Sequence, residues 1–196
     1  MILLASRSPQ RRALLGLTGV PFRVAVSGVD EGEDPLVNAR AKARDVAARL
    51  GVPPEGAVLG ADTEVLLDGR ALGKPADADE AAAMLRALAG RGHVVRTAVH
   101  LVTAAAGHDL VDDATVAVRP LGEAEVAWYA GTGEWRDRAG GYAIQGRGAT
   151  LVARIEGDHS TVVGLPLGAL SALLGELGLA PWARGAVGAT TTEGRR

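Results

Sequence analysis

Cysteine is absent from this sequence of 196 residues. Its absence rules out disulfide bonds, thiol catalysis and zinc sites built from cysteine, and it is typical of proteins from a reducing compartment. The N-terminus supports the same interpretation, because only four apolar residues separate Met1 from Ser6 and Arg7, too few for a signal peptide. We therefore expect a cytoplasmic protein.

Long apolar runs are also missing. The most apolar late segment, residues 162–183, is broken by Pro166, by several glycines and by Glu176. A membrane-spanning helix needs about 20 mostly apolar residues in a row. We therefore expect a buried strand and helix in this segment, and no membrane partner.

Aromatic residues and net charge are low as well. Aromatics make up 3% of the chain, and 21 Lys and Arg residues nearly balance 23 Asp and Glu residues, for a formal net charge of -2. Proteins that neutralise nucleic-acid phosphates carry a basic excess, and those that bind single strands offer aromatic surfaces for stacking. The composition disfavours a nucleic-acid partner and still permits a local basic pocket for a small anion.

The residues that are present suit a globular protein, with 47% hydrophobic and 22% charged residues. The length suits one domain or two closely joined lobes. We expect residues 1–184 to form a single domain. We expect residues 185–196, which are rich in Gly, Ala, Thr and Arg, to form a disordered tail.

Strand and helix patterns alternate along the chain. We predict strands at residues 2–5, 22–26, 57–67 with an interruption near 60–62, 93–103, 110–118, 150–155 and 161–163. We predict helices at residues 9–17, 35–50, 77–88, 123–130 and 167–177. Asp68-Gly69 is a hairpin-turn signal, and a second turn around residues 107–109 joins two long strands. This order predicts an α/β fold with a mixed sheet.

The turn between the first strand and the first helix is a candidate anion site. Ser8 and Pro9 are an N-cap and a first helical residue, and Arg7, Arg11 and Arg12 surround them. Free N–H groups at a helix N-terminus attract anions, and arginines bind phosphate oxygens in a forked geometry. An ordinary capped surface helix explains the same residues equally well.

Carboxylates appear at two places where they could serve chemistry. Asp62 ends an apolar strand, where α/β proteins place ligand and catalytic groups, and it could bind Mg²⁺ or take a proton from water. A turn cap is the alternative interpretation. Asp30 and Glu31 in an acidic loop could hold a hard cation, whereas we interpret Glu33 and Asp34 as solvated charges.

Two lysines are harder to interpret. Lys74 follows glycines in a segment that superficially resembles a Walker A loop, but the spacing is one residue short and Pro75 replaces the required Ser or Thr. Lys74 can still reach a phosphate as a point charge. Lys42 lies on the predicted helix 35–50, whose other charges look solvent-facing, so its pattern predicts a surface lysine.

Residues 134–146 form the richest loop, with charges, two aromatic side chains, an amide and several glycines. Gln145 in this loop could read a base edge with its paired donor and acceptor. A glycine-rich connection with incidental polar groups is the alternative. The histidines show no metal-ligand spacing, and we interpret His100 as structural and His108 as a turn residue.

Six segments in this order resemble the Maf family of nucleotide pyrophosphatases. They are LASRSP (4–9), GADT (60–63), LGKP (72–75), LAGRGHVV (88–95), AGGYAIQG (139–146) and VGLP (163–166). One such motif would be weak, but six in register are highly specific. The resemblance implies a two-lobed α/β fold with a mixed sheet, flanking helices and a central cleft, as in inosine triphosphatase. It also implies hydrolysis of nucleoside triphosphates between the α and β phosphates, dependence on Mg²⁺ or Mn²⁺, and a homodimer.

The resemblance also implies roles for individual residues. The aspartate that matches Asp62 activates water, and the positions around the phosphates and metal match Ser8, Arg11, Glu31, Lys42 and Lys74. Our hypothesis is that Glu31, with Asp62 nearby, holds the metal. Arg11, Lys74 and Arg138 then neutralise phosphate charge, as phosphoryl transfer requires. Whether Asp62 mainly takes the proton or mainly holds the metal stays open.

Departures from the family pattern bear on the substrate. Specificity in the family follows the positions of Gln10, Thr63 and Gln145, and the last two match the branch that acts on dTTP and UTP. Gln10 replaces that branch's Arg, Ala13 resembles a branch that acts on 7-methyl-GTP, and Arg138 replaces the usual Lys. We expect pyrimidine triphosphates, including modified ones, or broad specificity. The rival hypothesis is a nucleotide-binding regulator of cell division with weak hydrolysis, which an intact Asp62 disfavours.

Overall fold

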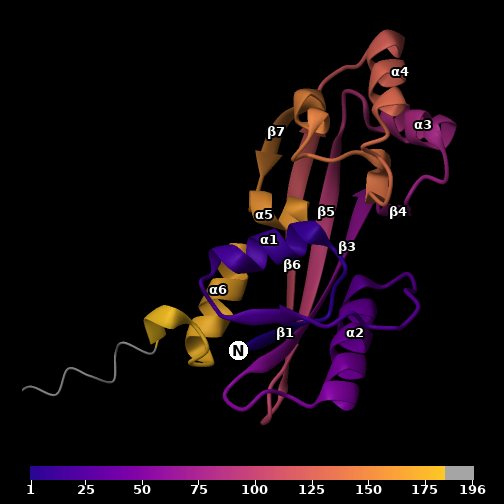
Figure 1. Cartoon of the computed structure of the whole chain (residues 1–196). Helices are drawn as coiled ribbons and strands as arrows, with labels where there is room; N and C mark the ends of the chain where they lie inside the picture. The colour runs from indigo at the N-terminus through magenta and orange to yellow at the C-terminus, as the bar shows by residue number, and fades with distance from the viewer. Residues whose placement is uncertain (184–196) are drawn as a thin grey trace, which may run out of the picture.

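The computed structural model describes residues 1–183 and shows a mixed α/β fold built on one sheet (Figure 1). The sheet has the strand order β2-β1-β3-β5-β6-β7, and β4 pairs with β3. Its strands are β1 (Ile2–Leu4), β2 (Phe22–Val24), β3 (Ala57–Leu67), β4 (Arg70–Leu72), β5 (Gly92–Val102), β6 (Gly107–Val118) and β7 (Val152–Glu156). β1 pairs in parallel with β2 and β3, whereas the other pairs are antiparallel.

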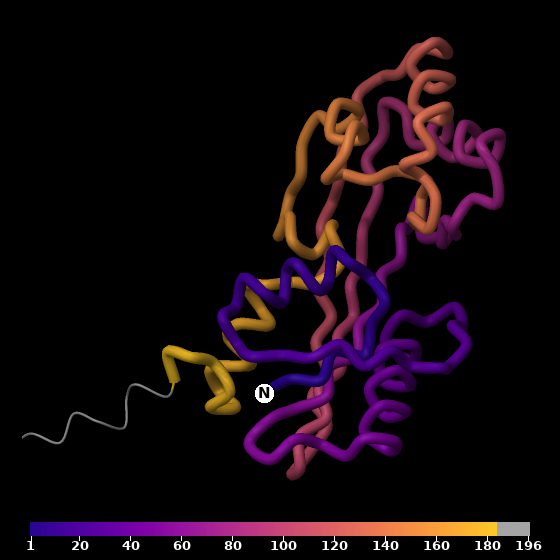
Figure 2. Tube along the Cα trace, in the orientation of Figure 1, coloured from indigo at the N-terminus to yellow at the C-terminus, as the bar shows by residue number. Residues whose placement is uncertain are grey.

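Helices cover both faces of this sheet. They are α1 (Pro9–Leu17), α2 (Pro35–Leu50), α3 (Ala78–Leu88), α4 (Glu123–Thr132), α5 (His159–Val163) and α6 (Leu167–Glu176), with short 3-10 turns at η1 (Ala139–Gly141), η2 (Arg147–Leu151) and η3 (Pro181–Ala183). The trace in Figure 2 shows the long strands β3, β5 and β6 running through both halves of the molecule. The predicted two-lobed α/β fold is confirmed.

Each lobe has its own apolar core. In the lower lobe, the part drawn at the bottom of Figure 1, successive residues of β1 point to opposite faces of the sheet. Ile2 and Leu4 pack toward α1 and α6, and Leu3 packs toward α2. In the upper lobe, α3 and α4 pack with Val65 and Val95 over the far halves of β3 and β5. The long strands thus hold the two lobes on one rigid support.

The edge of β3 is open between the lobes. β1 pairs with β3 only as far as Leu59, and β4 begins to pair with it at Val65. Within the described residues, no strand pairs with residues 60–64 on that edge. Functional side chains from both lobes can therefore gather at this gap.

Several local predictions hold and others are corrected. Ser8 caps α1 by accepting from the Arg11 amide at 3.3 Å. Asp68 and Gly69 both have positive φ, as expected of the turn between β3 and β4. The predicted break in β3 near residues 60–62 is wrong, since the strand is continuous. Gly60 instead allows close approach of α2, because a Cβ there would lie 2.1 Å from the Ala39 carbonyl oxygen.

Three further predictions fail at the chain's turns and ends. Residues 161–163 are helical in α5 and not a strand, because Asp158 accepts from the Ser160 amide at 2.7 Å and caps the helix. Residues 150–151 belong to η2, and β7 begins at Val152. His108 lies within β6, paired with Leu101, so the turn between β5 and β6 falls at residues 103–106 and not around 107–109 as predicted. The predicted tail, residues 185–196, lies outside the described residues.

No helix within residues 1–183 is both long and apolar enough to cross a membrane.

Candidate functional site

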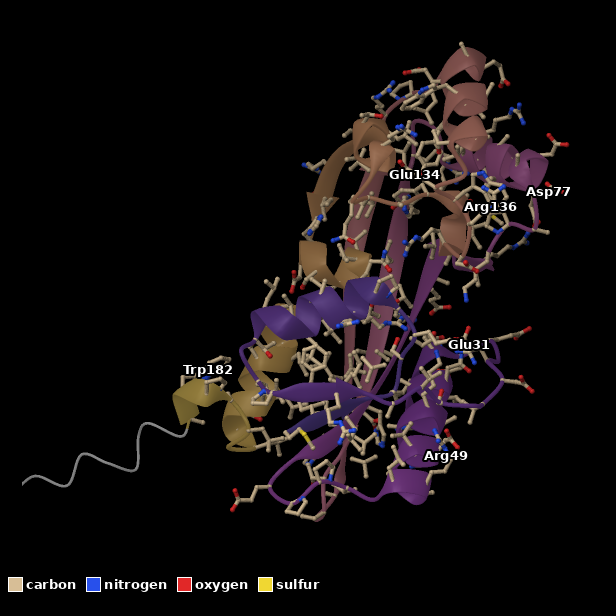
Figure 3. All side chains as sticks on the ribbon, in the orientation of Figure 1. Glu31, Arg49, Asp77, Glu134, Arg136 and Trp182 are labelled. Carbon is tan, nitrogen blue, oxygen red and sulfur yellow. The ribbon has the colours of Figure 1, made fainter. Side chains whose placement is uncertain are left out.

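A cavity of about 1070 Å³ opens at the gap along β3. Its walls come from the turn after β1, the loop after β2, the middle of β3 and residues 134–146. Figure 3 shows Glu31 on the lower side of this region, and Glu134 and Arg136 on the upper side. The volume is large enough for a nucleotide-sized ligand.

The cavity brings together the residues that the family resemblance assigned to the site, whereas Arg12 of the candidate anion turn is not among its lining residues. Its lining includes Ser8, Gln10, Arg11, Glu31, Lys42, Asp62, Thr63, Lys74, Arg138 and Gln145. They come from segments far apart in the chain, and the open edge of β3 lets them meet.

Asp62 lies in the middle of β3, so its expected position at a strand end is wrong. It comes next to the end of the parallel neighbour β1, which stops pairing at Leu59. Its Oδ1 accepts from Lys42 Nζ at 2.8 Å, and its Oδ2 accepts from Asn38 Nδ2 at 2.8 Å. Its side chain is only 14% exposed, so both donors hold it in a defined orientation.

Lys42 is buried, contrary to the surface lysine that its pattern predicted. Its ammonium lies 2.6 Å from Glu31 Oε1 and 2.8 Å from Asp62 Oδ1, and it also donates to the Ala61 carbonyl. The missed signal is its helical face, because Ala39 and Val46 at i-3 and i+4 are both fully buried. Burial of a lysine on an apolar face requires partners of opposite charge, which the two carboxylates supply.

Glu31 lies between two lysines. The pKa of Glu31 is lowered to about 2, chiefly by the hydrogen bond from Lys42 and to a smaller extent by Lys74, 3.3 Å from Oε2. Burial opposes the shift but does not overcome it. Glu31 is therefore ionised at neutral pH and holds the exposed Lys74 at the mouth of the site.

The two carboxylates suit a divalent cation shared with a phosphate ligand. Within residues 1–183, no three His, Cys, Asp or Glu side chains gather as a complete metal site. Glu31 and Asp62 nevertheless converge on the same ammonium. Each of their four oxygens makes one contact with a donor, which leaves a lone pair free on each. Mg²⁺ is typically bound by one or two carboxylates plus phosphate oxygens and water, so the residues fit it.

Arg11 reaches the gap from α1. Its Nε donates to the Gly164 carbonyl and its Nη2 donates to Thr63 Oγ1, both at 2.9 Å. Burial lowers the pKa of the Arg11 guanidinium, which the nearby Asp62 and Glu31 partly oppose. The guanidinium nevertheless stays charged at neutral pH, because its ordinary pKa is so high. A fixed positive charge thus lines the same cavity as the two carboxylates.

Thr63 is the first link of a buried hydroxyl chain. Thr97 Oγ1 donates to the Thr161 carbonyl at 2.8 Å, so its single proton is used there. The contact of 2.9 Å between Thr63 Oγ1 and Thr97 Oγ1 must then be donated by Thr63. Because Thr63 also accepts from Arg11, its hydroxyl proton is directed away from the cavity and its oxygen orients the guanidinium.

The remaining candidates line the cavity with fewer contacts. Ser8 Oγ donates to Gln10 Oε1 at 3.2 Å. Gln145 and Arg138 face the cavity from the opposite lobe. The buried Nε of Arg138 makes no hydrogen bond to any other described residue. Polar groups from both lobes are therefore free to meet a ligand.

Comparison with known proteins identifies the family. The sequence model of the family described as Maf-like protein matches residues 1–177. The chain belongs to this family. It is 50% identical to the dTTP/UTP pyrophosphatase of Thermus thermophilus, over 94% of this chain and 95% of that protein. It is 46% identical to the dTTP/UTP pyrophosphatase of Deinococcus radiodurans, over 88% of this chain and 91% of that protein.

A solved structure shares the fold. The structure of a HAM1 protein from Coxiella burnetii superposes with a TM-score of 0.54 and 17% identity, covering 89% of this chain and 98% of that chain. At this identity the likeness concerns the fold alone. It agrees with the mixed sheet and flanking helices of this Maf-like chain.

Sequence reasoning missed one residue of the site. Asn38 is 4% exposed and contacts Asp62 directly. Its position could have been found from helix periodicity, since it lies four residues before Lys42 on the same face of α2. A buried amide on such a face requires hydrogen-bond partners, which makes it a candidate for a role in the site.

Proposed function

We propose that this Maf-like chain hydrolyses nucleoside triphosphates, with dTTP and UTP preferred, to the monophosphate and pyrophosphate. The observation that carries the proposal is the convergence of Asp62 and Glu31 on Lys42 in a cavity that Arg11 also lines. The names of the two bacterial relatives support the same reaction and the same substrates.

The chain's own groups suit attack by water at the α-phosphorus. Asp62, held at both oxygens, orients a water molecule and accepts its proton as the water oxygen bonds to phosphorus. The bond from the α-phosphorus to the bridging oxygen breaks, and pyrophosphate leaves with the bonding electrons. Arg11 and Lys74, with Arg138 from the other lobe, stabilise the negative charge on the phosphates.

A divalent cation, Mg²⁺ or Mn²⁺, completes the proposed site. Glu31 and Asp62 would hold it through their free lone pairs, and it would supply charge stabilisation at the phosphate oxygens. Lys42 keeps the two carboxylates together before the cation and nucleotide arrive. Removal of divalent cations with a chelator is expected to abolish hydrolysis, and addition of Mg²⁺ to restore it.

The base is proposed to bind near Gln10, Thr63 and Gln145. The two amides offer paired donors and acceptors from opposite lobes, which suits the edge of a pyrimidine. Thr63 contributes to the base site indirectly, by orienting the side chain of Arg11. The family resemblance further supports a homodimer, and the lack of cysteine supports a cytoplasmic location. Sedimentation velocity would measure the oligomeric state.

The test is a panel of nucleoside triphosphates with Mg²⁺, in which pyrophosphate, monophosphate, orthophosphate and diphosphate are all measured. We expect pyrophosphate and monophosphate, fastest from dTTP and UTP. Asp62→Asn is expected to lower kcat at least about 100-fold, whereas the control Asp79→Asn, on the exposed surface of α3, leaves it unchanged. Release of orthophosphate and diphosphate would refute the cleavage site, and no release from any triphosphate would refute the reaction.

A further inference from the structure

Asn38 connects three parts of the site that are distant in the sequence. Its Nδ2 donates to Asp62 Oδ2 at 2.8 Å and to the Gly32 carbonyl at 2.9 Å, and its Oδ1 accepts from the Gly32 amide at 2.7 Å. These contacts join helix α2 to strand β3 and to the loop after β2. The side chain is nearly fully buried, so the contacts are shielded from water.

Only one orientation of the Asn38 amide satisfies all of these partners. Its two N–H donors face two acceptors, the Asp62 carboxylate and the Gly32 carbonyl, and its oxygen faces the Gly32 N–H. A reversed amide would place its oxygen against the carboxylate and its NH₂ against a donor. The carboxylate and the backbone of Gly32 therefore select the same rotamer.

The pairing with Gly32 determines where Glu31 lies. Residues 28–34 contain no strand or helix, so the loop depends on side-chain contacts for its position. Two of those contacts come from Asn38 and fall on Gly32, the residue next to Glu31. They involve neutral donors and acceptors, so they do not depend on the ion pairs of Glu31 with the lysines.

We propose that Asn38 is a positioning residue that sets the separation and orientation of the Asp62 and Glu31 carboxylates for the reaction. The inference rests on the proposed function, in which these carboxylates activate water and hold the cation. Asn38 acts through Asp62 and Gly32 and does not touch the substrate. Residues that orient such groups from behind typically change activity or metal affinity by about 10- to 100-fold when substituted.

The first experiment is steady-state kinetics of Asn38→Leu and Asn38→Asp with dTTP and Mg²⁺. Leu has a similar size and loses all of the contacts. Asp keeps the shape and an acceptor for the Gly32 amide, but places a carboxylate against Asp62. We expect both variants to lower kcat by about 10- to 100-fold with KM changed by less than about twofold, and to raise the Mg²⁺ concentration for half-maximal rate.

The second experiment measures how mobile the loop of residues 28–34 is, and it does not depend on catalytic activity. Hydrogen–deuterium exchange of the nucleotide-free variants is expected to show faster exchange confined to residues 28–34. The matched control is Val37→Ala on the adjacent, exposed position of α2, which should change neither the kinetics nor the exchange. If the wild type hydrolyses no triphosphate, the proposed function fails while the exchange experiment still tests the positioning of the loop.

The outcomes separate a positioning role from a merely structural one. Unchanged kcat in both folded variants, or exchange in residues 28–34 equal to that of the wild type, would overturn the proposal. Faster exchange throughout α2 and β3 with KM and kcat affected alike would also overturn it, since Asn38 would then only stabilise the fold. If Asn38→Leu does not fold, Asn38→Asp carries the test alone.

Discussion

Lys42→Met is predicted to destabilise the protein in a way that depends on pH. Met has a similar length and no charge, so it removes the ammonium that lies 2.6 Å from Glu31 and 2.8 Å from Asp62. Two carboxylates are then left close together without their shared partner. Breaking a buried ion pair costs about 3–5 kcal/mol, and because Glu31 is 44% exposed we expect about 2–3 kcal/mol near pH 6.

The pH dependence follows from the pKa of Glu31. In the wild type, Lys42, with a smaller contribution from Lys74, lowers this pKa from 4.5 to about 2. A carboxylate with a lowered pKa in the folded state contributes stability above its unfolded pKa, and this stability is lost as the pH falls through the folded value. A drop of this size is equivalent to about 3 kcal/mol, and screening by water reduces it to about 1 kcal/mol for a side chain this exposed.

Urea denaturation followed by circular dichroism at pH 6, 5, 4 and 3 measures the difference. In Lys42→Met the pKa of Glu31 returns toward its ordinary value, so its protonation no longer costs stability. We therefore expect the destabilisation by Lys42→Met to shrink by about 0.5 kcal/mol or somewhat more between pH 6 and pH 3, which is most of the contribution of about 1 kcal/mol. Lys74→Met is the control, because Lys74 contacts the same carboxylate at 3.3 Å from a more exposed position and should have a smaller effect. A cost that is constant or grows toward pH 3 would refute the reasoning.

Three other substitutions test the geometry of the site. Gly60→Ala should lower the stability of the fold by about 3 kcal/mol or more in thermal unfolding, because the new Cβ would lie 2.1 Å from the Ala39 carbonyl oxygen. A cost below about 1 kcal/mol would show instead that α2 moves away easily. Thr97→Val should cost about 1–3 kcal/mol in urea denaturation, because it leaves the buried Thr161 carbonyl without its donor, and an unchanged midpoint would contradict this. Gln145→Ala should reduce the ratio of kcat/KM for dTTP over dGTP by about 10-fold or more if its amide reads the base, and an equal loss for both nucleotides would assign it a general role instead.

Local chemistry explains why much of the fold could be predicted from the sequence. Ser8 and Pro9 start α1 because one supplies an acceptor for a free amide and the other is preorganised for the first turn. Asp68 and Gly69 form the turn because both tolerate positive φ. Such signals involve residues within a few positions of each other, so they can be recognised in the sequence without knowledge of the tertiary contacts. Residues 161–163 show the limit, since a cap at Asp158 outweighs their preference for a strand.

For the candidate site, the residues themselves could be predicted from the sequence, but their contacts could not. The motif residues, including Asp62, Glu31 and Arg11, were predicted from family resemblance and all line the cavity. Their contacts were not predicted, because hydrogen-bond partners such as Arg11 and Gly164 are separated by most of the chain. Helix periodicity could have indicated that Asn38 is buried, but its contact with Asp62 could not be predicted, because it forms only when β3 lies against α2.

From the sequence alone, most of the strands and helices, several of their caps and turns, and the set of residue types suited to a triphosphate and a divalent cation could be predicted. These follow from backbone preferences and side-chain chemistry, which act over short distances. The burial of Lys42, and the position of Asp62 in mid-strand at an edge left open between β1 and β4, became visible only in the folded molecule. Such positions depend on which strands pair and where they stop, and on how closely α2 can approach Gly60, which are properties of the packed molecule as a whole.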